Sequence, residues 1–203
     1  MSNTFDTRAS TWDEDPARLQ LAAGIFSALE RQIPLQPGFT ALDYGCGTGL
    51  LTLALAPRVR HLASIDSSKG MLDVLAQKIQ AASIRNVDPL LADFSKDPLP
   101  RGHFDLVASA MTLHHVLDIP AILLQFFSLL SPGGYIALAD LDAEDGTFHS
   151  NNDGIPHFGF DRDLLSRQLR ACGFANIQFI TATRVQKHGR IYPVFLATAQ
   201  KPQ

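Results

Sequence analysis

Cysteine is scarce in this sequence: 2 of its 203 residues are cysteines. Cys46 lies in a glycine-rich turn and Cys172 at the end of a predicted helix, so we interpret both as free thiols rather than as a disulfide pair. Free thiols are typical of a reducing compartment, and we therefore expect a cytoplasmic protein.

Neither sign of charge dominates the chain. Its 17 lysines and arginines nearly balance its 20 aspartates and glutamates, which leaves a formal net charge of −3. A chain without a basic excess has no general electrostatic attraction for nucleic acid or for an anionic membrane surface. We therefore expect neither a nucleic-acid partner nor a membrane partner.

Long hydrophobic runs are missing as well. The longest apolar stretches, such as residues 121–124, fall far short of the roughly 20 residues that a membrane-spanning helix needs. The first six residues lack the basic and then apolar pattern of a signal peptide. The length fits a single domain over residues 1–203, and no repeat or linker divides it.

A regular alternation of strand-like and helix-like segments fills most of the chain. Short apolar runs alternate with segments whose apolar residues recur every three or four positions, which predicts an α/β fold with a mostly parallel sheet and helices on both faces. The predicted strands are 39–42, 59–66, 87–91, 104–110 and 135–141, and the predicted helices are 19–33, 50–56, 68–79, 119–130 and 161–172, the last with Leu164, Leu165 and Leu169 on its apolar side.

The pattern changes after residue 141. Residues 142–160 are rich in Asp, Asn, Gly and His and are too long for an ordinary connection, so we predict an acceptor-side functional loop. Two extended runs, 174–185 and 191–199, follow with only five residues between them. A connection this short cannot cross over the sheet, so these strands should pair antiparallel. The polar residues 1–16 predict a partly ordered lead-in or lid.

The seven residues Asp43–Gly49, with the sequence DYGCGTG, join the first predicted strand to the helix that follows it. Glycine permits positive φ and a close approach of a ligand to the backbone, and the helix directs its free N–H groups to the same spot. The turn therefore predicts a cofactor cradle. A dinucleotide fingerprint needs its third glycine where this chain has Leu50, so the spacing argues against that cofactor.

Acidic residues end three successive predicted strands: Asp43, Asp66 and Asp93. Open α/β sheets bind ligands at the carboxyl ends of their strands, and Asp66 is placed to accept hydrogen bonds from ribose hydroxyls. Aspartate also favours turns, so Asp43 alone has an equally good structural interpretation. The agreement of all three acids with the glycine turn favours a nucleoside-containing cofactor. Asp105, near the start of its strand, is interpreted as structural.

The glycine turn, the three acids and the terminal hairpin together resemble the class I S-adenosylmethionine-dependent methyltransferases, and most closely the small-molecule branch described as methyltransferase type 11. The resemblance extends from about Trp12 to Lys201. It implies a Rossmann-like seven-stranded sheet, mostly parallel, that ends in a C-terminal antiparallel β-hairpin. It also implies S-adenosyl-L-methionine as the cofactor and S-adenosyl-L-homocysteine as the product.

The resemblance assigns cofactor-binding residues along the whole edge of the predicted sheet. Met71 would pack on the adenine, although its helical spacing fits an ordinary core residue equally well. The residues expected at the methionine portion are Asp43, Gly45, Cys46, Gly47 and Ala110, and those expected around the ribose and adenine are Asp66, Ser67, Met71, Asp93 and Phe94.

Histidines dominate the predicted acceptor side. His114 and His115 follow the fourth strand, where one of them could take a proton from a hydroxyl or amine acceptor, and the alternative is that they pack or cap beneath the site. Trp12, His149 and His157 are expected substrate-side residues. The spacing of the loop histidines and carboxylates matches no standard ligand pattern, so we predict no metal.

Several motifs of other methyltransferases are missing. The chain has no Asp/Asn-Pro-Pro-Tyr/Phe run for nucleic-acid amino groups, no Pro-Cys nucleophile for cytosine carbon, and too few cysteines for arsenite methylation. We therefore predict methyl transfer to an oxygen, nitrogen or carbon of a small-molecule acceptor, with apolar walls from Trp12, Phe148 and Phe158. The alternatives are a non-catalytic S-adenosylmethionine-binding module that acts through a partner, and a nicotinamide-dependent oxidoreductase. The sequence does not indicate the oligomeric state.

Overall fold

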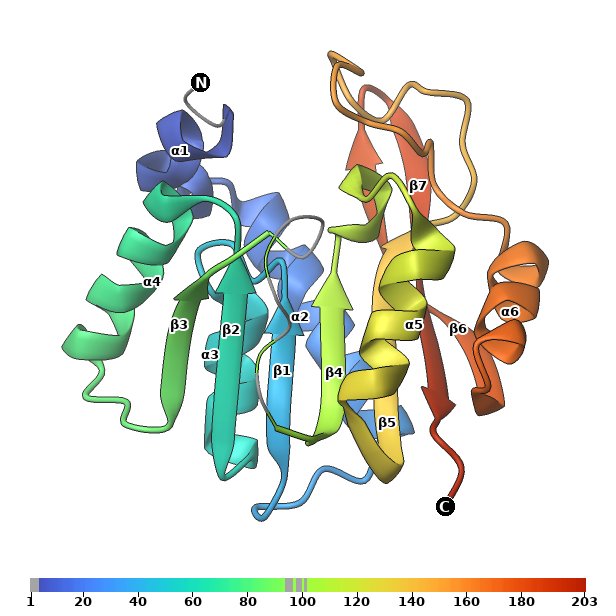
Figure 1. Ribbon diagram of the computed structural model, residues 1–203. Coiled ribbons are helices and arrows are strands. Elements are labelled where there is room, and N and C mark those ends of the chain that lie inside the picture. The colour runs from blue at the N-terminus through green and yellow to red at the C-terminus, as the bar shows by residue number, and fades with distance from the viewer. Residues whose placement is uncertain (1–3, 94–96, 98–99, 101) are drawn as a thin grey trace.

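The computed structural model describes residues 4–93, 97, 100 and 102–203. Its centre is a seven-stranded sheet in the order β3-β2-β1-β4-β5-β7-β6 (Figure 1). Strands β1 to β5 are parallel to one another, and β7 runs antiparallel to both β5 and β6. The strands are β1 (Thr40–Tyr44), β2 (His61–Asp66), β3 (Val87–Leu91), β4 (Phe104–Ala110), β5 (Leu130–Leu141), β6 (Ala175–Lys187) and β7 (Arg190–Gln200).

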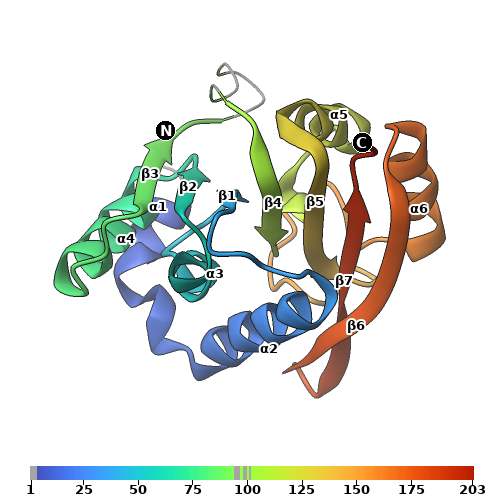
Figure 2. The ribbon, with the colours of Figure 1, turned by 90° about the horizontal axis from the view of Figure 1, so that it is seen from below.

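Helices cover both faces of the sheet, as Figure 2 shows from below. Helices α2 (Pro16–Gln32), α3 (Leu50–Leu55) and α4 (Lys69–Ala81) lie on one face, and α5 (Ile119–Leu129) and α6 (Arg162–Ala171) on the other. Successive strand residues point to opposite faces, so Leu106 joins the core under α2 and Val107 the core under α5. Both are fully buried, which explains why the central strands are apolar throughout.

The last two strands form the predicted antiparallel hairpin. Its turn is His188-Gly189, and both residues have positive φ, 51° and 73°, as the tight turn of a two-residue hairpin requires. The connection is shorter than the five residues expected, because Gln186 and Lys187 already pair with Ile191 and Arg190. The hairpin therefore extends beyond the rest of the sheet edge (Figure 1).

Two local expectations need correction. Leu164 is 49% exposed and does not belong to the apolar side of α6, because only Leu165 and Leu169 of the three leucines point at the sheet. The lead-in is also more ordered than its polar composition suggests. It forms α1 (Thr4–Arg8) and the 3-10 helix η1 (Ala9–Glu14), which pack against α4. Polar contacts rather than a broad apolar face hold this segment, so hydrophobic periodicity does not reveal it.

The long segment 142–160 contains no helix or strand and only one isolated bridge, between Asp142 and Phe160. It runs over the same edge of the sheet as the ends of β1, β2 and β4 (Figure 1). Asp161 then caps α6 by accepting a hydrogen bond from the Leu164 amide at 2.7 Å. The predicted loop and helix boundaries are confirmed to within one residue here.

Candidate active site

The glycine turn lies at the carboxyl end of β1, between the ends of β2 and β4. The amides of Gly45 and Cys46 both donate to the Ile65 carbonyl, at 2.8 and 3.0 Å, which ties the turn to β2. A Cβ on Gly45 would lie 2.2 Å from Thr112 Cγ2, so the turn packs against the segment after β4. A Cβ on Gly47 would meet nothing within 4 Å. Gly47 therefore lines open space, where a ligand can approach the backbone.

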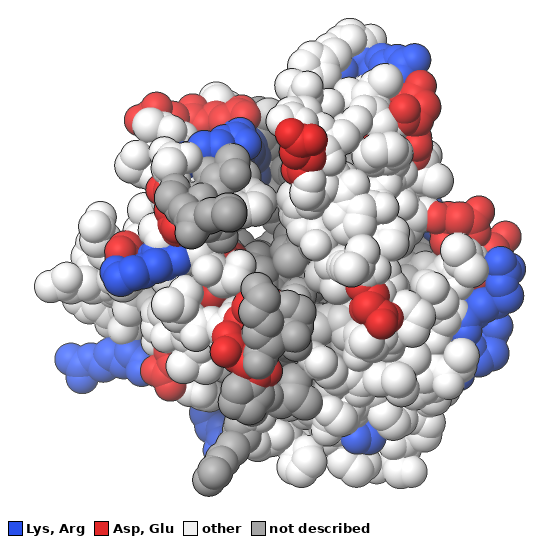
Figure 3. All heavy atoms as spheres, turned by 45° about the horizontal axis from the view of Figure 1, so that its top comes forward, with Lys and Arg blue, Asp and Glu red and all other residues white. Residues whose placement is uncertain are grey.

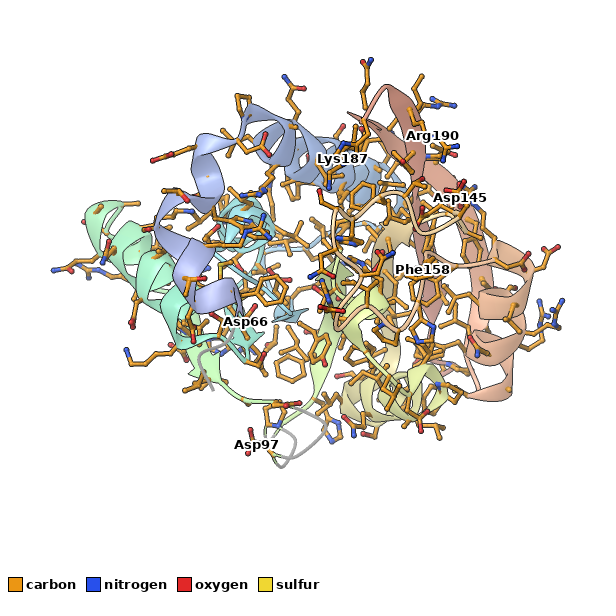
Figure 4. The ribbon with its side chains drawn as sticks, turned by 90° about the horizontal axis from the view of Figure 1, so that it is seen from above. Asp66, Asp97, Asp145, Phe158, Lys187 and Arg190 are labelled. Atoms are coloured by element: carbon orange, nitrogen blue, oxygen red, sulfur yellow. The ribbon has the colours of Figure 1, made fainter. Side chains whose placement is uncertain are left out.

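Asp66 joins this turn to the start of α4. Its Oδ2 accepts a hydrogen bond from the Gly47 amide and its Oδ1 one from the Ser68 amide, both at 2.8 Å. Burial raises the pKa of Asp66, and these two amides oppose that effect. The carboxylate stands half-buried at the end of β2 (Figure 4). The predicted ribose contact fits this place and remains a proposal.

Asp43 points away from the ligand side. Its side chain is buried under α3, where Thr52 Oγ1 donates to Oδ2 at 2.7 Å and also lies 3.1 Å from Ser64 Oγ. Burial raises the pKa of Asp43 to about 7. The geometry thus favours the structural interpretation of this side chain, in which it holds the strand-to-helix junction together. Its proposed cofactor contact would have to come from the backbone.

The other predicted cofactor residues are spread over the same edge. Met71 is only 2% exposed and Cys46 7%, so both are core residues here, and burial raises the pKa of the Cys46 thiol well above its usual range. Ser67 is exposed, whereas Ala110 is half-buried at the end of β4. Asp93 is half-buried after β3, and Phe94 lies outside the described residues.

On the acceptor side, His114 forms a buried pair with Asp140 of β5. Asp140 Oδ1 lies 2.8 Å from His114 Nδ1, and Oδ2 accepts the His114 amide at 3.2 Å. His114 is 2% exposed and Asp140 0%. Because a carboxylate only accepts, the pair fixes Nδ1 as the protonated nitrogen. One ring nitrogen of His114 is thus engaged by Asp140, and this burial favours the alternative in which His114 packs beneath the site.

His115 and His149 are the more accessible members of the histidine cluster. Their rings lie 4.2 and 5.1 Å from the His114 ring and 6.1 Å from each other. Burial, with a smaller effect from the neighbouring His114, lowers the pKa of each to about 4. Among the described residues the buried Nε2 of His149 has no hydrogen-bond partner. Both rings are therefore neutral at pH 7. His115 already has a backbone hydrogen bond at Gly154, whereas Nε2 of His149 is available for one.

Aromatic side chains flank these two histidines. Phe5 lies 5.2 Å from the His115 ring and 5.9 Å from Trp12, and Phe148 lies 4.9 Å from the His149 ring. The N-terminal helices and the 142–160 loop thus contribute one wall each. Figure 3 shows the surface hollowed near the centre of this side, between the half that carries α1 and α4 and the half that carries the loop.

Two predicted substrate-side residues lie apart from the cluster. His157 Nε2 is 2.9 Å from the Val116 carbonyl, and its ring packs on Phe160 at 5.4 Å. It therefore anchors the loop. Phe158 is 42% exposed and lies beside Gly146 of the same loop, so it does not join the cluster as Trp12 and Phe148 do.

The structure has cavities outside this site as well, including one of about 380 Å³ between residues 142–145 and 190–193. A cavity of about 320 Å³ lies at the amino ends of β2 and β4, where His61 and Phe104 line it, and so on the far side from the glycine turn. Among the described residues, no group of three or more His, Cys, Asp or Glu side chains could hold a metal ion. Within the same part of the chain, no helix is long and apolar enough to cross a membrane.

Sequence reasoning missed three contributors to the site. Asp140 was visible only as a lone acid in the apolar run of β5, and Thr112 donates to the Gly45 carbonyl at 3.2 Å. Asp6, from α1, accepts hydrogen bonds from Ser68 Oγ at 2.5 Å and from the Gly70 amide at 2.9 Å. A single acid in an apolar run can be recognised in the sequence as a candidate site residue. Hydrogen bonds between residues more than 60 positions apart cannot be recognised there.

Comparison with known proteins points to one class. Residues 41–134 match the family model described as a methyltransferase domain. The chain is 36% identical over 192 residues to the malonyl-[acyl-carrier protein] O-methyltransferase of Serratia marcescens, with 91% of this chain and 70% of that protein covered. It is 32% identical over 121 residues to an uncharacterized methyltransferase of Schizosaccharomyces pombe, with 56% of this chain and 43% of that protein covered. A SAM-dependent methyltransferase from Aquifex aeolicus shares the fold, with a TM-score of 0.72, 20% identity, and 97% and 98% of the two chains covered.

The fold and the glycine turn define a Rossmann-like, nucleoside-binding α/β protein. The chain belongs to the class I S-adenosylmethionine-dependent methyltransferases. This assignment confirms the predicted fold class, cofactor and enzyme class. The chain spans less than half the length of the Schizosaccharomyces pombe relative, at 43%.

The residues present fit the cofactor of this family. Open space beside Gly47 leaves room for it, and Asp66 offers carboxylate oxygens beside that space. When bound, S-adenosylmethionine supplies a methyl group on a positively charged sulfur, which is already an activated leaving group. The chain itself would then have to orient the acceptor and exclude water.

Proposed function

We propose that this protein transfers the methyl group of S-adenosylmethionine to a small organic acceptor held between the N-terminal helices and the 142–160 loop. The observation that supports this most is the convergence of two sets of residues on one sheet edge. The cofactor cradle of Gly47 and Asp66 lies at the ends of β1 and β2, and the cluster of His115 and His149 lies beyond the ends of β4 and β5.

The protonation of the histidines narrows the proposed chemistry. A base with a pKa of about 4 removes a proton poorly from a hydroxyl acceptor, since proton transfer is most efficient when the pKa lies near the working pH. His115 and His149 therefore act as neutral hydrogen-bonding groups that orient the acceptor. Acceptors that attack without first losing a proton, such as a carboxylate oxygen or a neutral amine, fit this site best.

Two measurements test the proposal. Titration calorimetry should show binding of S-adenosylhomocysteine, and a panel of carboxylate, amine, phenol and thioester-linked carboxylate acceptors should yield S-adenosylhomocysteine from S-adenosylmethionine with at least one member. The thioester-linked member is included because the Serratia marcescens relative is named for a malonyl carrier. Binding without transfer to any acceptor would favour a non-catalytic module that acts through a partner.

Replacement of His115 by Asn then tests the orienting role. We expect a rise in the KM for the acceptor or a fall in kcat, with the affinity for S-adenosylhomocysteine unchanged. His188→Asn, in the exposed hairpin turn, is the matched control. Equal losses of thermal stability and activity in the His115 variant would instead assign this residue a purely structural role.

A further inference from the structure

Two basic side chains at the mouth of the candidate active site have no acidic partner among the described residues. The ammonium of Lys187 lies 4.4 Å from the centre of the Phe148 ring, and the guanidinium of Arg8 lies 5.2 Å from the centre of the Trp12 ring. The ion pairs found in the described part of the chain include neither of them. Each therefore retains unused N–H donors.

The positive charges that act on Lys187 outnumber the negative ones. Burial lowers the pKa of Lys187, and the positive charges of Arg8 and Arg18 lower it further, with Asp15 opposing them. Arg18 is itself occupied, because it donates to the Trp12 carbonyl at 2.8 Å and lies 3.6 Å from Asp15. Holding Lys187 near these positive charges, with Asp15 as the one acid that opposes them, costs electrostatic energy, which a bound anion would relieve.

A single aromatic ring separates Lys187 from the histidine cluster. The Phe148 ring contacts the Lys187 ammonium, and its centre also lies 4.9 Å from the centre of the His149 ring. Figure 4 shows Lys187 between α2 and the 142–160 loop, facing the interior of the molecule. On the other wall, Trp12 and Phe5 connect Arg8 to His115 in the same way.

We propose that Lys187 and Arg8 form a binding site for a carboxylate group of the acceptor. This inference rests on the proposed function and narrows the acceptor to an organic anion with an apolar body. The carboxylate would lie between the two cations, and the apolar part would lie against Trp12 and Phe148 on the way to the histidines. The chain as a whole carries a net charge of −3, so the pair is a local feature and not part of a general basic surface.

Ligand-observed NMR with matched fragments tests this proposal on the full chain, both free and loaded with S-adenosylhomocysteine. The probes are phenylacetate, its neutral counterpart phenylacetamide, and phenyl phosphate. The variants Lys187→Met and Arg8→Met keep an unbranched apolar side chain and remove the charge. Arg190→Met is the matched control, because Arg190 lies on the same hairpin but points outward and pairs with Asp145 at 2.9 Å (Figure 4).

We expect phenylacetate to bind with a Kd about 10-fold lower than phenylacetamide, and each of the two test variants to raise the phenylacetate Kd by about 5- to 10-fold, as the loss of one charged hydrogen bond implies. Phenylacetamide binding and the control variant should not change. Equal affinity for the acid and the amide, or wild-type affinity in Lys187→Met, would overturn the proposal. A clear preference for phenyl phosphate would also overturn it in favour of a phosphate site.

Separate experiments distinguish a failure of the proposed methyl transfer from a failure of the proposed carboxylate site. Calorimetry with S-adenosylhomocysteine and the transfer assay do not depend on the charge of Lys187, whereas fragment binding is measurable in the free protein without any turnover. A protein that binds phenylacetate through Lys187 but never transfers a methyl group would refute the enzyme proposal alone. Transfer to neutral acceptors with no effect of Lys187→Met would refute the carboxylate site alone.

Discussion

Replacement of His115 by glutamine should remove a pH-dependent part of the stability of the folded chain. Burial and the neighbouring His114 lower the pKa of His115 from 6.5 to about 4. The imidazole therefore binds a proton more weakly in the folded chain than in the unfolded chain. Its contribution to stability is complete above pH 6.5 and is lost as the pH falls toward 4.

The two pKa values set the size of the effect. Linkage gives a loss of about 2 kcal/mol in the free energy of unfolding between pH 7 and pH 4.5. The wild-type profile alone does not isolate it, because burial raises the pKa of Asp43 to about 7 and so makes that carboxyl more stabilising at low pH. Subtracting the free energy of unfolding of His115→Gln from that of the wild type at each pH cancels the effect of Asp43, which both proteins share.

Urea unfolding at pH 7, 6, 5 and 4.5 measures this difference. From pH 7 to pH 4.5, the free energy of unfolding of the wild type should fall by about 2 kcal/mol more than that of His115→Gln. His188→Asn, which changes an exposed histidine of the hairpin turn, should follow the wild type throughout. If the profiles of wild type and His115→Gln run parallel from pH 7 to 4.5, His115 is not held neutral by burial, and the argument for an orienting rather than a basic role fails with it.

Other variants test the cofactor side. Gly47→Ala should raise the Kd for S-adenosylhomocysteine more than 10-fold in calorimetry, because its methyl group would occupy the ligand space, whereas Gly189→Ala has similar backbone strain and open space and should leave that Kd unchanged. Asp43→Asn should gain stability over wild type by about 2–3 kcal/mol between pH 5 and pH 8 in urea unfolding, since the wild-type carboxyl must ionise in the core as the pH rises through about 7. Asp66→Ala should weaken S-adenosylhomocysteine binding by about 1–3 kcal/mol through loss of a charged acceptor, and unchanged affinity would argue against the ribose contact.

Most of the fold was predictable because its signals are local. Glycines and acids mark the ends of β1 and β2, and apolar runs mark the strands between them. The short connection around Gly189 was enough to predict that the last two strands pair antiparallel, which the structure confirms. The N-terminal helices escaped prediction because Asp6 and Asp13 hold them through polar contacts to distant residues, and these contacts leave no periodic pattern.

The sequence predicts a site at the carboxyl ends of the strands, but it does not predict the surroundings of each side chain there. Both His114 and His115 carry the same side chain at adjacent positions, and only the distant Asp140 separates a buried support from a more accessible partner. Asp43 likewise fits the family motif, yet its side chain turns into the core toward Thr52. The proposed role of Lys187 gave no signal in the sequence, because it depends on Arg8, which lies more than 170 positions away.

The N-terminal helices link the two halves of the site. Asp6 binds Ser68 and Gly70 at the start of α4, and Asp13 contacts both Thr48 of the glycine turn and Lys78 of α4, so this segment lies over the cofactor side. The same short segment supplies Phe5 and Trp12 to the acceptor wall and Arg8 to its mouth. A change in the cofactor cradle that moves these helices must therefore also move the acceptor wall. If the cofactor and the acceptor bind as proposed, this one segment of chain contacts both of their sites, and we expect the two binding events to be coupled.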